Sequence, residues 1–301
     1  MLLLYYGAKN LNVFSANYYN MIKILVTGGN GNIAQMIKRN LHDKYDITNA
    51  SRSDLDLLNY SNMLTYFEHH SFDIVIHTAI LGGRRTKSEN GEISHINILM
   101  FENLLKFSNE FKMIINLDSG AIYDRMGDIY CRKEDDLYTV PTDYYGFSKY
   151  VIHERSRAFN NVFNFRIFNV FHQREEPDRF IASCFNANKT GEKLVIFEDK
   201  FFDFIYEDDF VKIVDYYVKN MDNTSILSKT INIGYSDKYR LSDIARLIIE
   251  NHDLIEVKNS EMLHNYCGNC SRLTNLPIQF DGLEKSILLY RVAKNKLYTG
   301  M

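Results

Sequence analysis

A phenol and an ammonium group lie four residues apart in the segment YGFSK, which places Tyr145 and Lys149 on one face of a helix near its start. The pKa of a free tyrosine is about 10, too high for easy proton exchange at neutral pH, and a neighbouring lysine cation favours the phenolate. Tyr145 could then act as the general acid when a carbonyl is reduced, or as the base when an alcohol is oxidised. The pair predicts hydride-transfer chemistry, although Y-x-x-x-K often arises by chance in a chain with 21 tyrosines.

A third polar side chain follows an apolar run upstream of this pair. The run MIINL at 113–117 is typical of a strand, and Ser119 comes two residues after it. A hydroxyl at the carboxyl end of such a strand lies in the crevice where doubly wound sheets bind ligands. We therefore expect Ser119 to hydrogen-bond the reacting oxygen beside Tyr145. The alternative is a serine that only caps a turn.

A glycine-rich turn indicates a second kind of chemistry. The segment TGGNGNIA at 27–34 has the spacing G-x-x-G-x-x-A, between an expected strand and an expected helix. Glycine lets the backbone approach a pyrophosphate without a Cβ in the way, and the helix N-terminus offers free amides. This context predicts a dinucleotide site that includes Gly28, Gly31, Asn32 and Ile33, rather than a purely structural turn.

The end of the second expected strand bears on the choice of cofactor. NAD sites usually carry an acidic residue there, about 20 residues after the glycines. This chain has NASRS at 49–53, with no carboxylate before Asp54. Ser51 and Arg52 could bind a 2′-phosphate, so we favour NADP over NAD. The alternative is that Arg52 is a solvated charge and that Asp54 or Asp56 holds the ribose or adenine of NAD.

Alternating strands and helices are expected to position these groups. Strands are expected at 22–27, 45–51, 73–79, 111–117 and 162–170, and helices at 32–41, 61–70, 92–109 and 144–160. This order predicts an α/β fold with a Rossmann-type doubly wound parallel sheet over 21–170. Residues 171–301, with helices at 178–189, 208–220 and 241–252 and short strands near Leu194, Phe204 and Ile231, are interpreted as a smaller C-terminal α/β substrate-binding region, partly interleaved with the first. Residues 1–20 are interpreted as a loose extension.

The composition narrows the class of protein. With 35 Lys and Arg against 38 Asp and Glu, the formal net charge of -3 gives no reason to expect nucleic-acid binding. No apolar run approaches the roughly 20 residues of a membrane span. Cys267 and Cys270 have zinc-type spacing and His264 could add a ligand, but two ordinary thiols are the simpler interpretation, so no metal site is expected. Four cysteines in 301 residues fit a reducing, cytoplasmic setting.

Together the motifs resemble one family. The turn TGGNGNIA, HTA at 77–79, DSGAIYD at 118–124, YGFSK, FRIFNVF at 165–171, FDFIYEDDF at 202–210 and INIG at 231–234 have the order and spacing of the extended short-chain dehydrogenase/reductase family, in its nucleotide-sugar epimerase, dehydratase and reductase group. The resemblance implies a catalytic triad of Ser119, Tyr145 and Lys149. It implies further cofactor contacts from Asp56, Leu57, Thr78, Ala79, Phe168 and Val170. It implies sugar-nucleotide contacts from Gly83, Ser119, Gly120, Ala121, Asn169 and Arg179.

Departures from the family pattern narrow the reaction. Dehydratases of this group carry an Asp-Glu pair after the catalytic Ser or Thr, where this chain has Gly120 and Ala121, and neither can move a proton. GDP-fucose synthase has a cysteine at the position of Ala121 and a histidine in the loop near Arg179, so we do not expect double epimerisation. The resulting hypothesis is NADP(H)-dependent reduction of the C4 carbonyl of a nucleoside-diphosphate 4-keto-(6-deoxy) sugar, with Tyr145 as general acid. In this character the chain is nearest to the GDP-fucose synthase-like 4-reductases.

Two alternatives stay open at this point. One is an NAD-dependent nucleotide-sugar 4-epimerase that uses the same triad, and the other is a non-catalytic NADP-binding protein. The resemblance also implies a homodimer, in which the helices expected at 92–109 and 144–160 of two chains form a four-helix bundle. It further implies a role in deoxysugar synthesis for a surface polysaccharide.

Overall fold

The computed structural model describes residues 21–83, 89–260 and 264–299, so the extension expected at 1–20 lies outside the described residues. Its strands are β1 Lys23–Thr27, β2 Asp46–Ala50, β3 Ile74–His77, β4 Met113–Ser119, β5 Ile129–Arg132, β6 Val162–Ile167, β7 Val170–Phe171, β8 Leu194–Ile196, β9 Ile205–Tyr206, β10 Thr230–Ile233, β11 Ile255–Val257 and β12 Tyr266–Gly268. Its helices are α2 Asn32–Leu41, α3 Tyr60–His69, α4 Gly91–Leu105, α5 Tyr144–Ser156, α6 Phe180–Thr190, α7 Glu207–Lys219, α8 Leu241–Ile248, α9 Ser271–Thr274 and α10 Gly282–Thr299.

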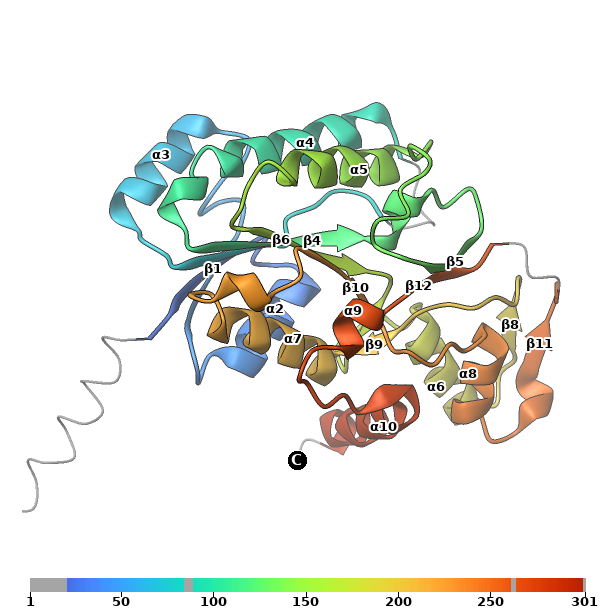
Figure 1. Ribbon diagram of the computed structural model, residues 1–301. Helices are drawn as coiled ribbons and strands as arrows, with labels where there is room; N and C mark the ends of the chain where they lie inside the picture. Colours follow the sequence, from blue (N-terminus) through green and yellow to red (C-terminus); the bar gives the residue numbers. More distant parts are fainter. Residues whose placement is uncertain (1–20, 84–88, 261–263, 300–301) are drawn as a thin grey trace, which may run out of the picture.

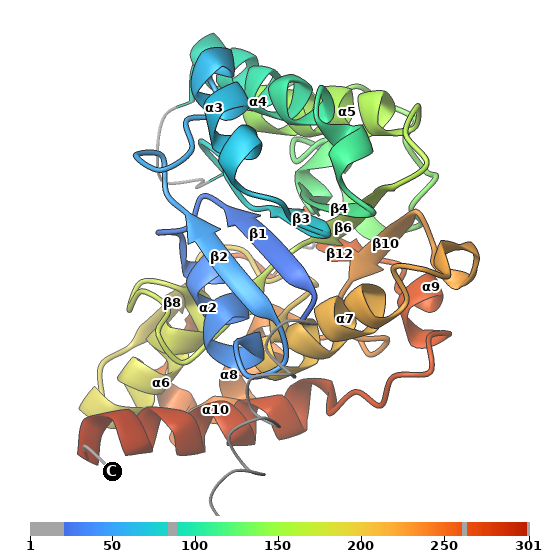
Figure 2. The same cartoon turned by 90° about the vertical axis from the view of Figure 1, so that its left-hand side faces the viewer.

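Six parallel strands form the central sheet, in the order β10-β6-β4-β3-β1-β2. Helices α3, α4 and α5 cover one face of the sheet, and α2 and α7 cover the other (Figures 1 and 2). Parallel strands joined by crossover helices end at the same edge of the sheet, which is where ligands bind in such folds. The predicted α/β fold with a doubly wound parallel sheet is confirmed.

The strands inside the sheet are rich in apolar residues because both faces of the sheet are buried, whereas the edge strand β2, DITNA, is largely polar. In β1, Leu25 packs with Phe101 and Leu104 under α4. Its neighbours Ile24 and Val26 point to the opposite face, where the core includes Met36 of α2. Period-two alternation thus supplies two separate cores from one run of apolar residues.

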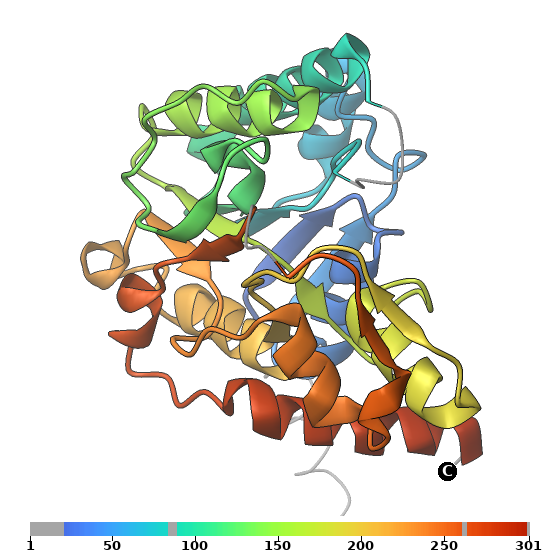
Figure 3. The same ribbon diagram turned by 90° about the vertical axis from the view of Figure 1, so that its right-hand side faces the viewer.

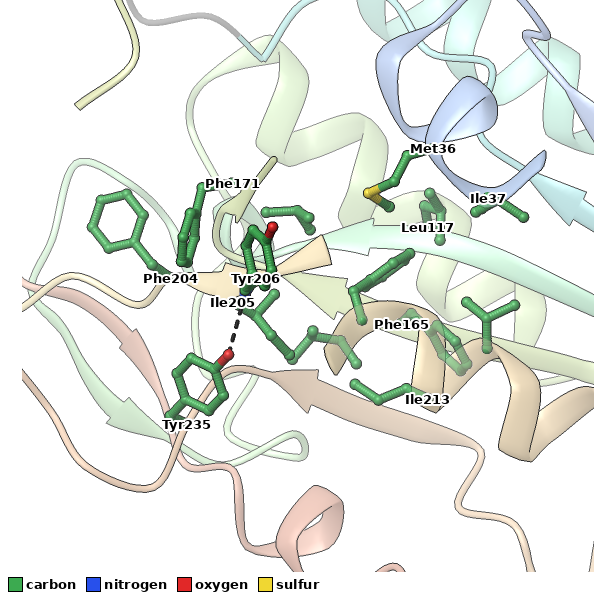
Figure 4. Close-up of a cluster of buried hydrophobic side chains, with 14 of the residues drawn as sticks. Met36, Ile37, Leu117, Phe165, Phe171, Phe204, Ile205, Tyr206, Ile213 and Tyr235 are labelled. Carbon is green, nitrogen blue, oxygen red and sulfur yellow. Dashed lines mark hydrogen bonds between the residues drawn. The ribbon is translucent and has the colours of Figure 1, made fainter. Parts of the chain in front are cut away.

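The core on the face of the sheet covered by α2 and α7 continues into the C-terminal half of the chain. Figure 4 shows Leu117 and Phe165 of the central sheet in the same cluster as Phe171 and Tyr206 of the small β7–β9 sheet. The hydroxyl of Tyr235 accepts a hydrogen bond from the backbone N–H of Tyr206 at 3.3 Å. Helix α10 packs against this cluster through Leu283, Ile287 and Tyr290. Elements α6, α8, β8 and β11 lie together, away from α3, α4 and α5 (Figures 1 and 3). The described helices include none that is both long and apolar enough to cross a membrane.

Several expected bounds were wrong. The strand expected at 162–170 ends at Ile167, because the chain leaves the sheet at Phe168 and resumes as β7 in another sheet. The ring of Phe168 packs against Tyr266, with centroids 5.1 Å apart. The helix expected at 92–109 ends at Leu105, and the one expected at 241–252 ends at Ile248. The sequence patterns gave no indication of β5, β12 or α10.

Candidate active site

One cavity of about 550 Å³ lies at the carboxyl edge of the central sheet. Its walls come from the start of α2, the ends of β3, β4 and β6 with the segments that follow them, the start of α5, and the more distant Phe202 and Tyr266. Of the residues predicted from the sequence, it is lined by Asn32, Ile33, Thr78, Ala79, Gly83, Ser119, Tyr145, Lys149, Phe168, Asn169, Val170 and Arg179. Residues drawn from segments far apart in the chain therefore share one cavity wall.

Tyr145 and Lys149 lie in the first turns of α5. The N-cap of this helix is Asp143, whose carboxylate accepts a hydrogen bond from the N–H of Gly146 at 2.8 Å. A Cβ on Gly146 would lie 2.7 Å from the carbonyl oxygen of Ala121, so glycine lets the helix start close to the loop after β4. The Lys149 Nζ atom lies 5.7 Å from the centroid of the Tyr145 ring and donates to the carbonyl oxygen of Leu117 at 2.6 Å.

The pKa of Tyr145 is raised above its ordinary value, and we had expected it to be lowered. Desolvation by the surrounding protein is the main cause, and the neighbouring Tyr266 and Asp118 raise the pKa further. A hydrogen bond with Ser119 and the charge of Arg125 act in the opposite direction. Burial also lowers the pKa of Lys149 to about 8. Both groups are thus shifted toward their neutral forms, because burial disfavours either charge.

Arg125 was missed from the sequence, and it lies directly beside Tyr145. Its guanidinium carbon is 5.3 Å from the centroid of the Tyr145 ring, and Arg125 lines the cavity. Asp143 pairs with this guanidinium, and Glu89 accepts from it at 3.2 Å. Glu89 also accepts from the N–H of Gly83 at 2.8 Å, and a Cβ on Gly83 would lie 3.0 Å from the Tyr145 ring. Arg125 therefore ties the loop before α4 to the start of α5.

Tyr266 was also missed, because it lies far along the chain on a three-residue strand. Its hydroxyl is 3.4 Å from the Ser119 Oγ atom. Its ring packs against Phe168 and Phe202, each with a centroid distance of 5.1 Å. A Cβ on Gly120 would lie 2.5 Å from the Phe168 ring and 3.1 Å from the Tyr266 ring, so the predicted substrate residue Gly120 makes room for this aromatic wall.

The glycine turn has the geometry that a pyrophosphate needs. Gly28 has φ of +66°, and a Cβ there would lie 2.8 Å from the Ala79 Cα atom. Gly31 is the N-cap of α2, with no side chain to cap the helix, and the first turn of α2 contains no acidic residue. The amides at this N-terminus are therefore left for an anion, and the residues present fit a dinucleotide.

The segment that follows β2 carries both basic and acidic side chains: Arg52, Asp54 and Asp56. The Ser51 N–H and hydroxyl donate to Asp54 at 2.9 and 2.6 Å. The Arg52 side chain is 77% exposed, and its Nε atom lies 3.7 Å from Asp56. These residues, with the buried Leu57, lie outside the wall of the cavity, as do Gly28, Gly31, Gly120 and Ala121. Of these, Ser51, Arg52, Asp56 and Leu57 follow β2, where the adenosine end of a dinucleotide would lie.

The remaining predicted contacts lie on the opposite side of the cavity. Arg179 donates to the Asn169 side chain at 3.2 Å, and both line the wall. Asn32 donates to Glu176 at 3.2 Å, which joins the glycine turn to this side.

Cys267 and Cys270 are buried, and the described part of the chain holds no group of three or more His, Cys, Asp and Glu side chains that could bind a metal ion.

Comparison with known proteins gives three kinds of match. The model of the NAD dependent epimerase/dehydratase family matches residues 24–234. A GDP-L-colitose synthase from Yersinia pseudotuberculosis is 30% identical over 109 residues, and this alignment spans 35% of each protein. A GDP-mannoheptose C4 reductase from Campylobacter jejuni, solved with NADP bound, has a TM-score of 0.73 at 18% identity, covering 91% of this chain and 98% of that one. The Bordetella bronchiseptica enzyme WbmG, solved with NAD, has a TM-score of 0.75 at 16% identity, covering 92% and 94%. At these identities the structural similarity concerns the fold.

Proposed function

The chain belongs to the NAD dependent epimerase/dehydratase family, as its motifs predicted, and on this basis we propose that it reduces the C4 carbonyl of a nucleoside-diphosphate 4-keto-6-deoxy sugar with NADPH. The observation that carries the proposal is the meeting of Ser119, Tyr145 and Lys149 in one cavity, at the same sheet edge as the glycine turn. The turn from Gly28 to Ile33 would hold the pyrophosphate. NADPH, when bound, supplies the hydride.

Each side chain of the triad then has a separate task. The Ser119 hydroxyl orients the carbonyl and polarises it by donating a hydrogen bond. The Tyr145 phenol gives its proton to the oxygen that becomes the C4 hydroxyl. Lys149 holds the nicotinamide ribose. The raised pKa of Tyr145 supports this direction of reaction, because a general acid must be protonated before it can donate.

One observation favours the 4-epimerase as a second candidate. Asp54 lies at the end of β2 and already accepts two hydrogen bonds from Ser51, which resembles the acidic position of an NAD site. A 4-epimerase would begin by oxidising C4 with NAD and would return the hydride to the other face of the sugar. The two candidates therefore differ in whether cofactor is consumed.

The deciding experiment follows nicotinamide absorbance with the purified protein, NADPH or NADH, and a panel of GDP-, dTDP-, UDP- and CDP-linked 4-keto-6-deoxy sugars. The reductase requires stoichiometric loss of NADPH with one of these sugars. If no sugar causes consumption of NADPH and NAD co-purifies with the protein, the reductase hypothesis is rejected and the 4-epimerase becomes the favoured function.

Cofactor choice gives a prediction at the surface of β2. Arg52→Ala is expected to raise the Kd for NADPH about 10-fold and to leave the Kd for NADH within about twofold, since only NADPH carries the 2′-phosphate. Arg157→Ala, which removes a similarly exposed arginine from the end of α5, is the matched control. Fluorescence titration of both cofactors measures the effect. Equal losses for NADPH and NADH would place the 2′-phosphate elsewhere.

We also propose a homodimer through α4 and α5. These helices pack side by side on the face of the sheet that α3 also covers, and α5 carries the exposed rings of Tyr144 and Phe147. Multi-angle light scattering of the purified protein should give about twice the chain mass of 35.3 kDa. Charged substitution of Phe147 should reduce it to one chain mass, whereas a wild-type monomer would reject this interface.

A further inference from the structure

A buried ion pair lies directly behind the reaction centre. Asp118, the residue before Ser119, is the register partner of Arg166 on the neighbouring strand β6. The Arg166 Nε atom donates to Asp118 Oδ2 at 2.9 Å, and neither side chain has any exposed surface. In a parallel pair, register partners point to the same face, and here that face is covered by α5, since Arg166 also reaches His153 at 3.4 Å. Asp118 and Lys149 thus lie between the same strand and helix.

The remaining bonds of Arg166 fix the pair in place. Its Nη1 atom donates to the Tyr123 hydroxyl at 2.6 Å and to the Glu134 carbonyl at 2.9 Å. The guanidinium cannot turn without breaking these bonds, so Asp118 is held by a rigid partner. The other oxygen, Asp118 Oδ1, is buried and has no hydrogen-bond partner among the described residues. Asp118 is among the residues of the active-site cavity wall, although its side chain has no exposed surface, so its carboxylate lies behind that wall.

Lys149 is the cation whose charged form this carboxylate would stabilise. It is 3% exposed, and its ammonium group donates to the carbonyl of Leu117, the residue before Asp118. Burial lowers its pKa, and the charge of Asp118 raises it. The other titratable groups around Lys149 are His77 on β3, whose pKa burial lowers to about 3, Tyr145 and His153 on α5, and Arg125 and Arg166 beyond Tyr145 and Asp118. Within this set, Asp118 is the negative charge.

We propose that Asp118 is a positioning residue for Lys149: held by Arg166, its carboxylate is the fixed counter-charge that keeps the Lys149 ammonium charged and in place beside Tyr145. A neutral Lys149 could neither attract a ribose hydroxyl as a cation nor favour the phenolate that Tyr145 becomes after donating its proton. The ion pair therefore serves the reaction centre and is more than an element of the core. The proposal concerns the charge of Lys149 and is testable without a substrate.

The direct test is the titration of Lys149 in the full chain, followed by NMR with lysine labelled with ¹³C at Cε and assigned with Lys149→Arg. Asp118→Asn is expected to move the Lys149 pKa below the wild-type value of about 8. The single variant leaves Arg166 buried without a counter-charge and could fail to fold. The double variant Asp118→Asn with Arg166→Gln removes both charges and restores neutrality in the core. In it the Lys149 pKa should still lie below wild type, by less than in the single variant.

Glu134→Gln is the matched control, because it also removes a buried carboxylate near Arg166. The Glu134 side chain bonds the Asn232 N–H and faces Arg272, away from Lys149. In the Glu134→Gln variant, the pKa of Lys149 should match that of the wild type. A wild-type Lys149 pKa in the double variant would overturn the proposal and reduce Asp118 to the counter-ion of Arg166.

A second arm of the test rests on the proposed function. With the sugar that consumes NADPH, the alkaline limb of kcat/KM should move to lower pH in the double variant and should stay in place in Glu134→Gln. If no sugar is turned over, the proposed function fails, while the NMR titration still decides the role of Asp118. An unmoved alkaline limb alongside a shifted Lys149 pKa would support the role of Asp118 in keeping Lys149 charged and would show that this charge does not limit turnover.

Discussion

Replacement of Tyr145 by phenylalanine is expected to lower kcat for carbonyl reduction by about 10²- to 10⁴-fold, the range that a general acid contributes. The variant removes only the phenolic oxygen. The ring stays between the Gly83 backbone and the Arg125 guanidinium, so the walls of the cavity keep their shape. NADPH should bind within about threefold of wild type, since the site we propose for its pyrophosphate is the glycine turn and not the phenol. Single-turnover measurement of NADPH oxidation and a fluorescence titration separate the two quantities.

Tyr217→Phe provides the control for loss of a buried phenol. The Tyr217 hydroxyl donates to the Ser228 carbonyl at 2.9 Å in the core under the sheet, far from the cavity wall. Its loss should cost about 1 kcal/mol of stability, the usual worth of one hydrogen bond, and should leave kcat unchanged. If Tyr145→Phe kept more than a tenth of the wild-type rate, another group would be the acid, and Tyr266, whose hydroxyl is 3.4 Å from Ser119, would be the next to test.

Five strands of the central sheet could be predicted from the sequence, four of them because they are buried apolar runs. The sixth strand, β10, was expected as a short strand near Ile231 in the C-terminal region, and the structure places it in the central sheet. The helix from 32 to 41 was predicted with its observed bounds, since the glycine turn marks its start. The break after Ile167 could not be predicted, because FRIFNVF is mostly apolar on both sides of it. At this break Phe168 packs against Tyr266, almost a hundred residues further on, and such a contact leaves no trace in local periodicity.

The same distinction holds for the site. Tyr145 and Lys149 are four residues apart and Ser119 ends a strand, so local spacing was enough to identify them as candidate site residues. Arg125 and Tyr266 lie in segments with no periodic pattern, and only the folded chain brings them to the cavity. The pKa of Tyr145 was expected to lie below its ordinary value, but burial raises it. Spacing along a helix carries no information on how deeply the two groups are buried.

The glycine turn leads to a prediction that separates a folding residue from a binding residue. A Cβ on Gly29 would lie 2.7 Å from the Asn49 carbonyl carbon and 2.9 Å from Ala50 backbone atoms, so β1 and β2 would have to move apart. Gly29→Ala is therefore expected to cost about 1–3 kcal/mol of stability, which lowers Tm by several degrees in a chain of this size. Thermal unfolding followed by circular dichroism measures this loss.

Gly31→Ala should behave in the opposite way. Gly31 has φ of −71° and ψ of 153°, which alanine adopts freely, and its Cβ would meet only the Gly28 carbonyl at 3.2 Å. Tm should therefore stay within about 2 °C of wild type. The new methyl group would stand at the N-terminus of α2, where the pyrophosphate has to approach the amides, so the Kd for NADPH should rise about 100-fold. Wild-type NADPH affinity in Gly31→Ala would mean that the dinucleotide does not lie on this turn, and the reductase and the epimerase would then both lose their cofactor site.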